Sequence, residues 1–259
     1  MKQILVLGNE PRQEYLFRLL KKKGYFAERQ ENFVDKQDIC RYDVILLPVP
    51  AHLTNQYMEQ MVSELGKEQL VFGCGFSEEM KSECKAGLID YMEGDEVAYY
   101  NAIATAEGTI AEAINRSAVN LHHSHSLVIG YGRCGEVLAE KLLSLHSYVT
   151  VMDRTGAKLA KAESLGFSVM DFPGKAESLS QFDFVFNTVP ATVVDKKMLE
   201  KLSTDITIID IASGGGGVDY EFCKKNQINA NLCLGLPGKY APKSSAAILL
   251  KVIEKVLGE

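Results

Sequence analysis

The sequence predicts an α/β protein with two domains, the second of which contains a doubly wound parallel sheet. Short apolar runs alternate with stretches of helical hydrophobic spacing along most of the chain, which is the pattern of α/β folds. One of these runs leads directly into a glycine-rich turn at residues 130–135, and a helical pattern follows it. With 259 residues, 46% of them hydrophobic, the chain is long enough for two domains that each bury a core.

The first domain, expected over residues 1–103, is the smaller α/β unit. Its strands are predicted where short apolar runs end at glycine or proline, because strands of a parallel sheet are buried on both faces. Its helices are predicted where leucines recur at helical spacing. The predicted strands are residues 3–7, 44–47 and 70–72, and the predicted helices are residues 12–23 and 55–65.

A connecting helix is predicted at residues 104–120, and the second domain is expected over residues 121–243. The alternation of strands and helices in the second domain predicts right-handed crossovers in a parallel sheet. A last amphipathic helix, residues 244–257, is expected to pack back on the first domain. The predicted strands of the second domain are residues 127–129, 148–151, 184–186, 206–209 and 230–233, and its helices are residues 135–145, 156–165, 196–202 and 220–226.

The glycine-rich turn favours dinucleotide binding because of its context. A glycine pattern alone is weak in a chain with 21 glycines, but dinucleotide-binding turns require the strand before it and the helix after it. Gly130 would allow the tight turn, Gly132 would let the backbone approach a pyrophosphate, and Gly135 would let the helix lie against the strand. We therefore expect a Rossmann-type domain; the alternative is an ordinary glycine-rich turn. The turn residues expected at the cofactor are Gly130, Tyr131, Gly132, Arg133, Cys134 and Gly135.

The residues that follow the next strand leave the choice between NAD and NADP open. Asp153 lies 18 positions after Gly135, close to the interval at which such domains place the group that binds the adenosine ribose. Its carboxylate would bind a ribose 2′-hydroxyl and repel a 2′-phosphate, which favours NAD. Arg154 and Thr155 would instead bind that phosphate, which favours NADP.

Two more strand ends are expected beside the cofactor, because ligands of open α/β sheets bind at the carboxyl ends of the strands. These ends are residues 187–190 and 210–217, and their small side chains would allow a nicotinamide ribose to pass near the backbone. The alternative for the four-glycine run at 214–217 is a flexible surface loop. The residues expected to contact the cofactor here are Thr188, Val189, Pro190, Ala212 and Ser213.

Composition argues against several classes of function. The net charge is −6 and the basic residues are scattered, so nucleic acid is not expected as a partner. No apolar run approaches the about 18 residues needed to span a bilayer, and no signal-peptide pattern is present. The six cysteines are widely spaced and include no CxxC pair, as expected for reduced thiols. We expect a cytoplasmic protein that is not bound to a membrane.

The chain resembles the A subunits of dipicolinate synthase. The matching segments run in order along nearly the whole sequence, and together they are more specific than the glycine turn. Common ancestry with 2-hydroxyacid and alanine dehydrogenases explains part of the likeness. The segments are residues 11–13, 101–110, 130–135, 187–190, 210–213 and 235–243.

The resemblance implies an NAD(P)-dependent oxidoreductase that oxidises dihydrodipicolinate, or its hydrated precursor, to dipicolinate during sporulation. It also implies NADP as the hydride acceptor, cofactor contact at Pro237 and a partner that is a flavoprotein-like B subunit. NAD stays open because Asp153 stands where the family tends to have a small residue. Ala104 replaces an expected proline, and Gly214 and Gly215 stand where an Arg-Pro pair is expected.

A ring with two carboxylates needs cationic or N–H donors, and its aromatisation needs a route for one proton. Arg12 and Lys243 are the candidates for the carboxylates, with solvated surface side chains as the alternative for both. Thr105 is a third expected substrate contact. The proton acceptor is expected among three residues: Asn101, Glu107 and His122.

Two of these residues have plain alternatives. Glu107 would be a capping carboxylate near the start of the connecting helix, and His122 belongs to a group of histidines that lacks a metal-binding partner at a usual spacing, so no metal is expected. Cys134 is expected to be a small residue of the turn and not a nucleophile.

Two competing functions remain. A related 2-hydroxyacid or alanine-type dehydrogenase would need a catalytic histidine late in the second domain, and no histidine follows His146. A non-catalytic NAD(P)-binding protein is favoured by the Gly214 departure. The sequence leaves the oligomeric state open, a homo-oligomer included.

Overall fold

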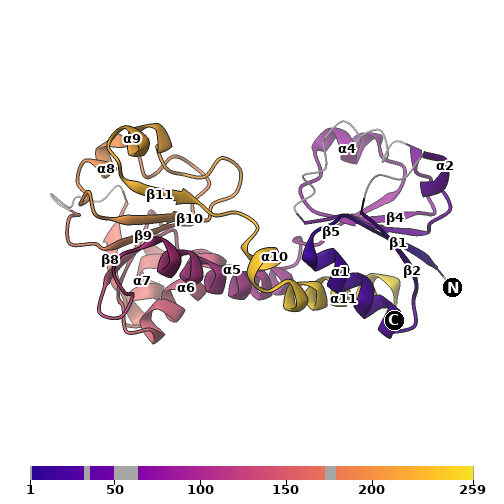
Figure 1. Cartoon of the computed structure of the whole chain (residues 1–259), viewed down its shortest axis with the longest axis horizontal. Coiled ribbons are helices and arrows are strands. Elements are labelled where there is room, and N and C mark those ends of the chain that lie inside the picture. The colour runs from indigo at the N-terminus through magenta and orange to yellow at the C-terminus, as the bar shows by residue number, and fades with distance from the viewer. Residues whose placement is uncertain (1, 32–35, 50–63, 173–178, 259) are drawn as a thin grey trace. The chain divides into compact units, whose positions relative to one another are not determined.

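The computed structural model of the chain describes residues 2–31, 36–49, 64–172 and 179–258. The chain divides into two compact units, Met1–Asn101 with Pro237–Glu259, and Ala102–Leu236. Each unit contains a parallel sheet with helices against it (Figure 1), which confirms the predicted fold class. Residues 237–243, expected in the second domain, belong to the first unit.

The first unit has a five-stranded parallel sheet in the order β2-β1-β3-β4-β5. This is the order of flavodoxin-like doubly wound sheets, in which the chain reverses direction between the first and third strands. Residues 55–63 of the predicted helix at 55–65 lie outside the described residues. The strands are β1 Gln3–Leu7, β2 Phe26–Gln30, β3 Val44–Leu46, β4 Leu70–Gly73 and β5 Gly87–Asp90, and the helices are α1 Pro11–Lys22, α2 Lys36–Ile39, α4 Glu78–Glu83, α10 Leu236–Tyr240, which begins at the unit boundary, and α11 Pro242–Leu257.

Helices α1 and α11 pack together on one face of this sheet. Leu16 of α1 and Leu249 of α11 are buried in the same cluster as Ile4 of β1. Lys23, which caps α1, forms a 2.8 Å ion pair with Glu254 of α11. The last helix of the chain therefore completes the core of the first unit.

The second unit has a six-stranded parallel sheet in the order β11-β10-β9-β6-β7-β8. Numbered from its own first strand, this is the dinucleotide-binding order, with the topological switch point between β6 and β9. Both strands at that point are buried. The strands are β6 His125–Ile129, β7 Tyr148–Asp153, β8 Ser168–Asp171, β9 Phe184–Asn187, β10 Thr207–Asp210 and β11 Asn229–Leu232, and the helices are α6 Arg133–Ser144, α7 Gly156–Ser164, α8 Lys196–Leu199 and α9 Tyr220–Lys225.

The connecting helix differs from its prediction at both ends. Helix α5 spans Asp95–Arg116, whereas the prediction was 104–120. Its first turns carry the exposed aromatic side chains of Tyr99 and Tyr100. Because these two large side chains are not buried, the sequence of these turns lacks the helical spacing of apolar residues on which the prediction depended. Residue 104 therefore lies in the interior of the helix and not at its start.

Candidate functional site

The glycine-rich turn has the geometry that dinucleotide binding requires. Gly130 has a φ of +90° and follows β6, so it adopts a conformation that favours glycine. A Cβ on Gly135 would meet the carbonyl oxygen of Gly130, which shows how closely α6 approaches the turn. Gly132, the N-cap of α6, has no heavy atom within 4 Å of the position of a Cβ. The first turn of the helix therefore has an open approach for an anion.

Asp153 holds this turn in place. Its Oδ2 accepts a hydrogen bond from the backbone N–H of Tyr131 at 2.8 Å, and its Oδ1 accepts one from the N–H of Thr155 at 2.9 Å. The ammonium of Lys158 lies 3.4 Å from Oδ2. Burial alone would raise the pKa of Asp153, but these two N–H groups and Lys158 outweigh it, so the pKa lies below its ordinary value. The carboxylate is charged at neutral pH and is shared between the turn and the cavity beside it.

A second network joins the loops after β9 and β10. Asp210 is fully buried; its Oδ1 accepts from Asn187 Nδ2 at 2.9 Å, and its Oδ2 accepts from the N–H of Gly217 at 2.6 Å and the hydroxyl of Tyr220 at 2.8 Å. Burial raises the pKa of Tyr220 far above its ordinary value, and Asp210 adds to this effect. Tyr220 is therefore a neutral hydrogen-bond donor at any physiological pH.

A cavity of about 470 Å³ opens at the carboxyl ends of β6, β7 and β9. It contains both acidic and basic groups, since Asp153 lies in its wall with Arg154 and Lys158. A volume of this size is within the range of ligand sites. It is lined by Ile129, Gly130, Gly132, Met152, Asp153, Arg154, Thr155, Lys158, Phe172, Thr188, Val189, Pro190, Ala191 and Val193.

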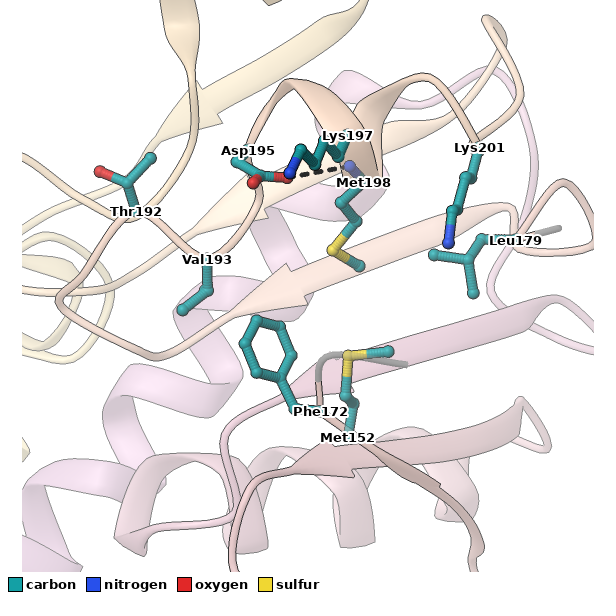
Figure 2. A pocket seen from close by; sticks show the side chains of 9 residues that line it. All are labelled: Met152, Phe172, Leu179, Thr192, Val193, Asp195, Lys197, Met198 and Lys201. Atoms are coloured by element: carbon teal, nitrogen blue, oxygen red, sulfur yellow. Dashed lines mark hydrogen bonds between the residues drawn. The ribbon is translucent and has the colours of Figure 1, made fainter. Parts of the chain in front are cut away.

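A smaller cavity of about 320 Å³ shares Met152, Phe172 and Val193 with the first. In Figure 2, Met198 of α8 points across this cavity toward Phe172. Asp195 accepts the N–H of Met198 at 2.9 Å and so caps α8. Its lining combines apolar side chains such as Met152 and Phe172 with the charged side chains of Asp195, Lys197 and Lys201.

Some of the residues predicted to contact the cofactor line the larger cavity, and the others lie outside it. The cavity contains the predicted glycines 130 and 132, the groups after β7 and the residues after β9. The ring of Tyr131 is buried against Phe167, and its N–H is bonded to Asp153. The predicted residues outside this cavity are Tyr131, Arg133, Cys134, Gly135, Ala212, Ser213 and Pro237.

Three of these outer residues differ in their surroundings. Burial raises the pKa of the Cys134 thiol, with a smaller opposing effect of Arg133, so this cysteine lacks the character of a nucleophile. Ala212 is buried, and its N–H is bonded to Asp210. Pro237 belongs to the first unit and not to the Rossmann unit.

The structure places His122 at the opposite end of its strand from the glycine turn. This residue precedes the amino end of β6, whereas the glycine turn follows the carboxyl end, and a five-residue strand spans about 16 Å. The ring of His122 lies 4.0 Å from that of His123 and 5.3 Å from that of His146. It belongs to an exposed aromatic cluster at the amino ends of the strands, so its predicted catalytic role has no support from the cofactor cavity.

The other predicted catalytic and substrate residues lie on α5. Glu107 accepts a 2.9 Å hydrogen bond from Lys141 of α6. The capping alternative for Glu107 is wrong, because α5 begins at Asp95. Thr105 is buried, and Asn101 is the last residue of the first unit on this helix.

Arg12 and Lys243 differ in exposure. Arg12 is only 2% exposed, which excludes the solvated surface alternative, and its Nη2 donates to the carbonyl of Val49 at 2.9 Å. Lys243 is exposed on the first turn of α11, as its alternative predicted. Burying a charged guanidinium costs free energy unless the charge is paired or hydrogen-bonded.

Lys158 is the main cofactor-side residue that the sequence interpretation missed. It lies in the first turn of α7 and places a second cation beside Arg154 at the cavity. A lysine five positions after the strand-end aspartate was the available signal.

Comparisons with known proteins show similarity in both sequence and fold. Residues 97–221 match the family described as "D-isomer specific 2-hydroxyacid dehydrogenase, NAD binding domain". The chain is 34% identical over 184 residues to the dipicolinate synthase A subunit of Bacillus subtilis, a match that covers 71% of this chain and 62% of that relative. The chain is a relative of the dipicolinate synthase A subunits. The resemblance expected from the sequence is thereby confirmed.

Two crystal structures of dipicolinate synthase A chains match the fold over its length. The one from Bacillus halodurans has a TM-score of 0.88 at 29% identity and covers 100% of this chain and 98% of that one. The one from Bacillus subtilis has a TM-score of 0.84 at 27% identity and covers 99% and 96%. The part of the chain at residues 97–221 thus matches a nicotinamide-binding domain of the 2-hydroxyacid dehydrogenase type. Among the residues that the structure describes, no helix has the length and hydropathy to cross a bilayer.

Proposed function

We propose that this chain is the A subunit of a dipicolinate synthase, which oxidises dihydrodipicolinate, or its hydrated precursor, to dipicolinate with NADP during sporulation. The observation that carries the proposal is the match to dipicolinate synthase A chains. In the reaction from dihydrodipicolinate, the ring loses one hydride and one proton and becomes aromatic. A cytoplasmic location, a partner that is a flavoprotein-like B subunit, and a homo-oligomeric state stay predictions of the sequence.

The described residues fit a bound dinucleotide. Gly132 leaves room for a pyrophosphate at the start of α6, and the cavity beside Asp153 has the position of a ribose site. The apolar walls formed by Met152 and Phe172 suit the adenine ring. When bound, the nicotinamide supplies the hydride acceptor.

NADP is proposed over NAD because of the charges at this cavity. Both carboxylate oxygens of Asp153 already accept backbone N–H groups, so the side chain is partly committed to the turn. Arg154 and Lys158 place two cations at the same cavity, next to the hydroxyl of Thr155. Together they suit a 2′-phosphate better than a bare ribose.

The substrate residues are proposed from the first unit and from α5. Arg12 and Lys243 would bind the two carboxylates, and Thr105 would contact the ring. Glu107 would accept the proton, with Asn101 as a hydrogen-bonding partner of the substrate. Glu107 is half-exposed and ion-paired with Lys141, so its carboxylate is accessible to a substrate proton.

The test is the conversion itself. The purified chain and the B subunit, mixed with fresh dihydrodipicolinate and NADP, should form dipicolinate, followed by its ultraviolet absorbance and by NADPH. The Glu107→Gln variant should lower kcat by about 100-fold, as expected for loss of a general base. The matched variant Glu140→Gln, at an exposed position of α6, should retain activity. Absence of product with both NADP and NAD would refute the proposal.

One second function has specific support, because the family match at residues 97–221 is to 2-hydroxyacid dehydrogenases. Oxidation of D-lactate or D-glycerate would favour it. The lack of any histidine after His146 argues against it, since this reaction needs a proton acceptor on the substrate hydroxyl.

A further inference from the structure

Among the residues that the structure describes, three buried polar atoms at the carboxyl ends of the first sheet's strands have no hydrogen-bond partner. They are Nε of Arg12, Oε1 of Gln13 and the hydroxyl of Tyr91. All three residues are at most 2% exposed. Native proteins pair nearly all buried polar groups, so a cluster of unpaired ones needs an explanation. A ligand that supplies the missing partners is one.

The three residues lie at the carboxyl ends of the strands. Arg12 follows β1 on the first turn of α1, and its Nη2 bonds to Val49, which follows β3. Tyr91 directly follows β5, and its N–H donates to the carbonyl of Gly73 at the end of β4. Gln13 Nε2 donates to the carbonyls of Leu7 and Leu46 and so ties β1 to β3 at the switch point. Open α/β sheets bind ligands at such a point.

Other contacts hold the guanidinium of Arg12 in place, while its Nε donates no hydrogen bond. Glu10 Oε1 lies 3.7 Å from Nε, which is too long for a hydrogen bond, and it accepts the N–H of Val49 at 3.3 Å. A Cβ on Gly238 would lie 2.6 Å from Nη2 of Arg12, so α10 packs directly on the guanidinium. This packing requires glycine at position 238. A guanidinium fixed in this way loses little entropy when it binds a carboxylate.

Tyr91 is the neutral partner of this cation. Its ring packs on Phe72 at 5.7 Å. Burial raises the pKa of Tyr91 well above its ordinary value of 10.0, although the charge of Arg12 acts against this effect. Burial also lowers the pKa of Arg12, partly offset by Glu10, but a guanidinium stays charged in proteins. At the carboxyl ends of the first sheet, Arg12 thus supplies a buried cation and Tyr91 a buried, neutral O–H donor.

We infer that Arg12 and Tyr91 form a carboxylate-binding site within the first unit, in which Nε of Arg12 and the hydroxyl of Tyr91 each donate a hydrogen bond to the same carboxylate. Gln13 is a positioning residue, because it joins the two strands that carry the site. The identity of this carboxylate as that of a dihydrodipicolinate-type substrate rests on the proposed function; the binding of a carboxylate does not. Tyr91 is a residue that the sequence interpretation did not assign.

The test compares two buried tyrosines of the first unit. Tyr42 is 1% exposed, and its hydroxyl bonds to Glu28 at 2.6 Å and to Arg41 at 2.7 Å. Tyr91→Phe and Tyr42→Phe each remove one buried hydroxyl oxygen. Among the described residues, that oxygen has hydrogen-bond partners in Tyr42 and none in Tyr91. The probes are dipicolinate and piperidine-2,6-dicarboxylate, titrated calorimetrically into the full chain with and without NADP.

Tyr91→Phe should weaken binding of the probes at least about tenfold, the effect of one hydrogen bond to a charged group, and should leave Tm unchanged or raise it. Tyr42→Phe should leave binding unchanged and lower Tm. Arg12→Lys, which keeps the charge and loses the fork of donors, should also weaken binding. Unchanged affinity in Tyr91→Phe, a fall in Tm equal to that of Tyr42→Phe, or no binding of either probe by the unmodified chain would each overturn the inference.

These outcomes separate the inference from the proposed function. If the chain with its B subunit fails to oxidise dihydrodipicolinate but binds the probes through Tyr91, only the proposed function fails. If it oxidises dihydrodipicolinate with the same KM in Tyr91→Phe and in the unmodified chain, only the inference fails.

Discussion

Alanine substitutions at Gly135 and Gly132 would separate the two tasks of the glycine turn. A Cβ at 135 would lie 3.0 Å from the carbonyl carbon of Gly130 and closer still to its oxygen, whereas ordinary carbon contacts are about 3.5–4.0 Å. Overpacking of this kind costs about 2 kcal/mol, which lowers Tm by roughly 4–8 °C in a chain of this size. At Gly132 a Cβ meets nothing within 4 Å, so the cost is at most about 1 kcal/mol, from a poorer N-cap.

For cofactor binding, unlike for stability, we expect the substitution at Gly132 to have a large effect. Gly132→Ala places a methyl group where a pyrophosphate would approach, and a steric cost of about 1–3 kcal/mol weakens binding by about 5- to 100-fold. Calorimetric titration of NADP and thermal melting of the free protein measure the two effects. Gly156→Ala, at the open first residue of α7, is the control and should change neither. Wild-type affinity for NADP and NAD in Gly132→Ala would refute the placement of the pyrophosphate at this turn.

Three further predictions concern the charged groups. Because the pKa of Asp153 lies below its ordinary value of 3.8, its stabilising effect is fully present above that value and is lost as pH falls through the lowered one. The Tm difference between wild type and Asp153→Asn should therefore shrink in that acid range, and a constant difference would contradict this. Lys158→Ala should raise KM for NADP more than KM for NAD in steady-state kinetics, while Lys161→Ala, on the same helix, should not; equal changes for both cofactors would argue against a 2′-phosphate site. Tyr220→Phe should lower the free energy of unfolding by about 1–2 kcal/mol in urea titrations, since buried Asp210 loses a donor.

The central strands were predictable, whereas three of the four edge strands were not. Strands β6 and β9 are almost entirely buried, so their sequences are continuous apolar runs. Strands β2, β5 and β8 lie at sheet edges and are only partly buried. Their sequences contain polar residues and lack the apolar run on which the prediction depended. Exposure at the edge of a sheet thus removes the signal that burial creates.

The cofactor turn was predictable because its determinants are local. Gly130, Gly132 and Gly135 lie within six residues, between a strand and a helix. The surroundings of Arg12 depend on contacts from Val49 and Gly238, which are brought together only by the order of the sheet and the return of the chain at α10. The sequence alone therefore could not distinguish a buried Arg12 from one on the surface.

The four glycines at 214–217 have different structural roles in the two halves of the run. Gly215 has no neighbour within 4 Å of a Cβ, and Gly214 differs only in a φ of +69°, so the first half has the character of the flexible loop considered as an alternative. A Cβ on Gly217 would lie 2.5 Å from Nδ2 of Asn187 and from two carbonyl oxygens, and its N–H bonds to Asp210. The second half is therefore part of the buried network that joins the ends of β9 and β10. Since that network sets the backbone next to Ala212, the loop offers a fixed base and an open tip at the edge of the sheet where the cofactor is expected.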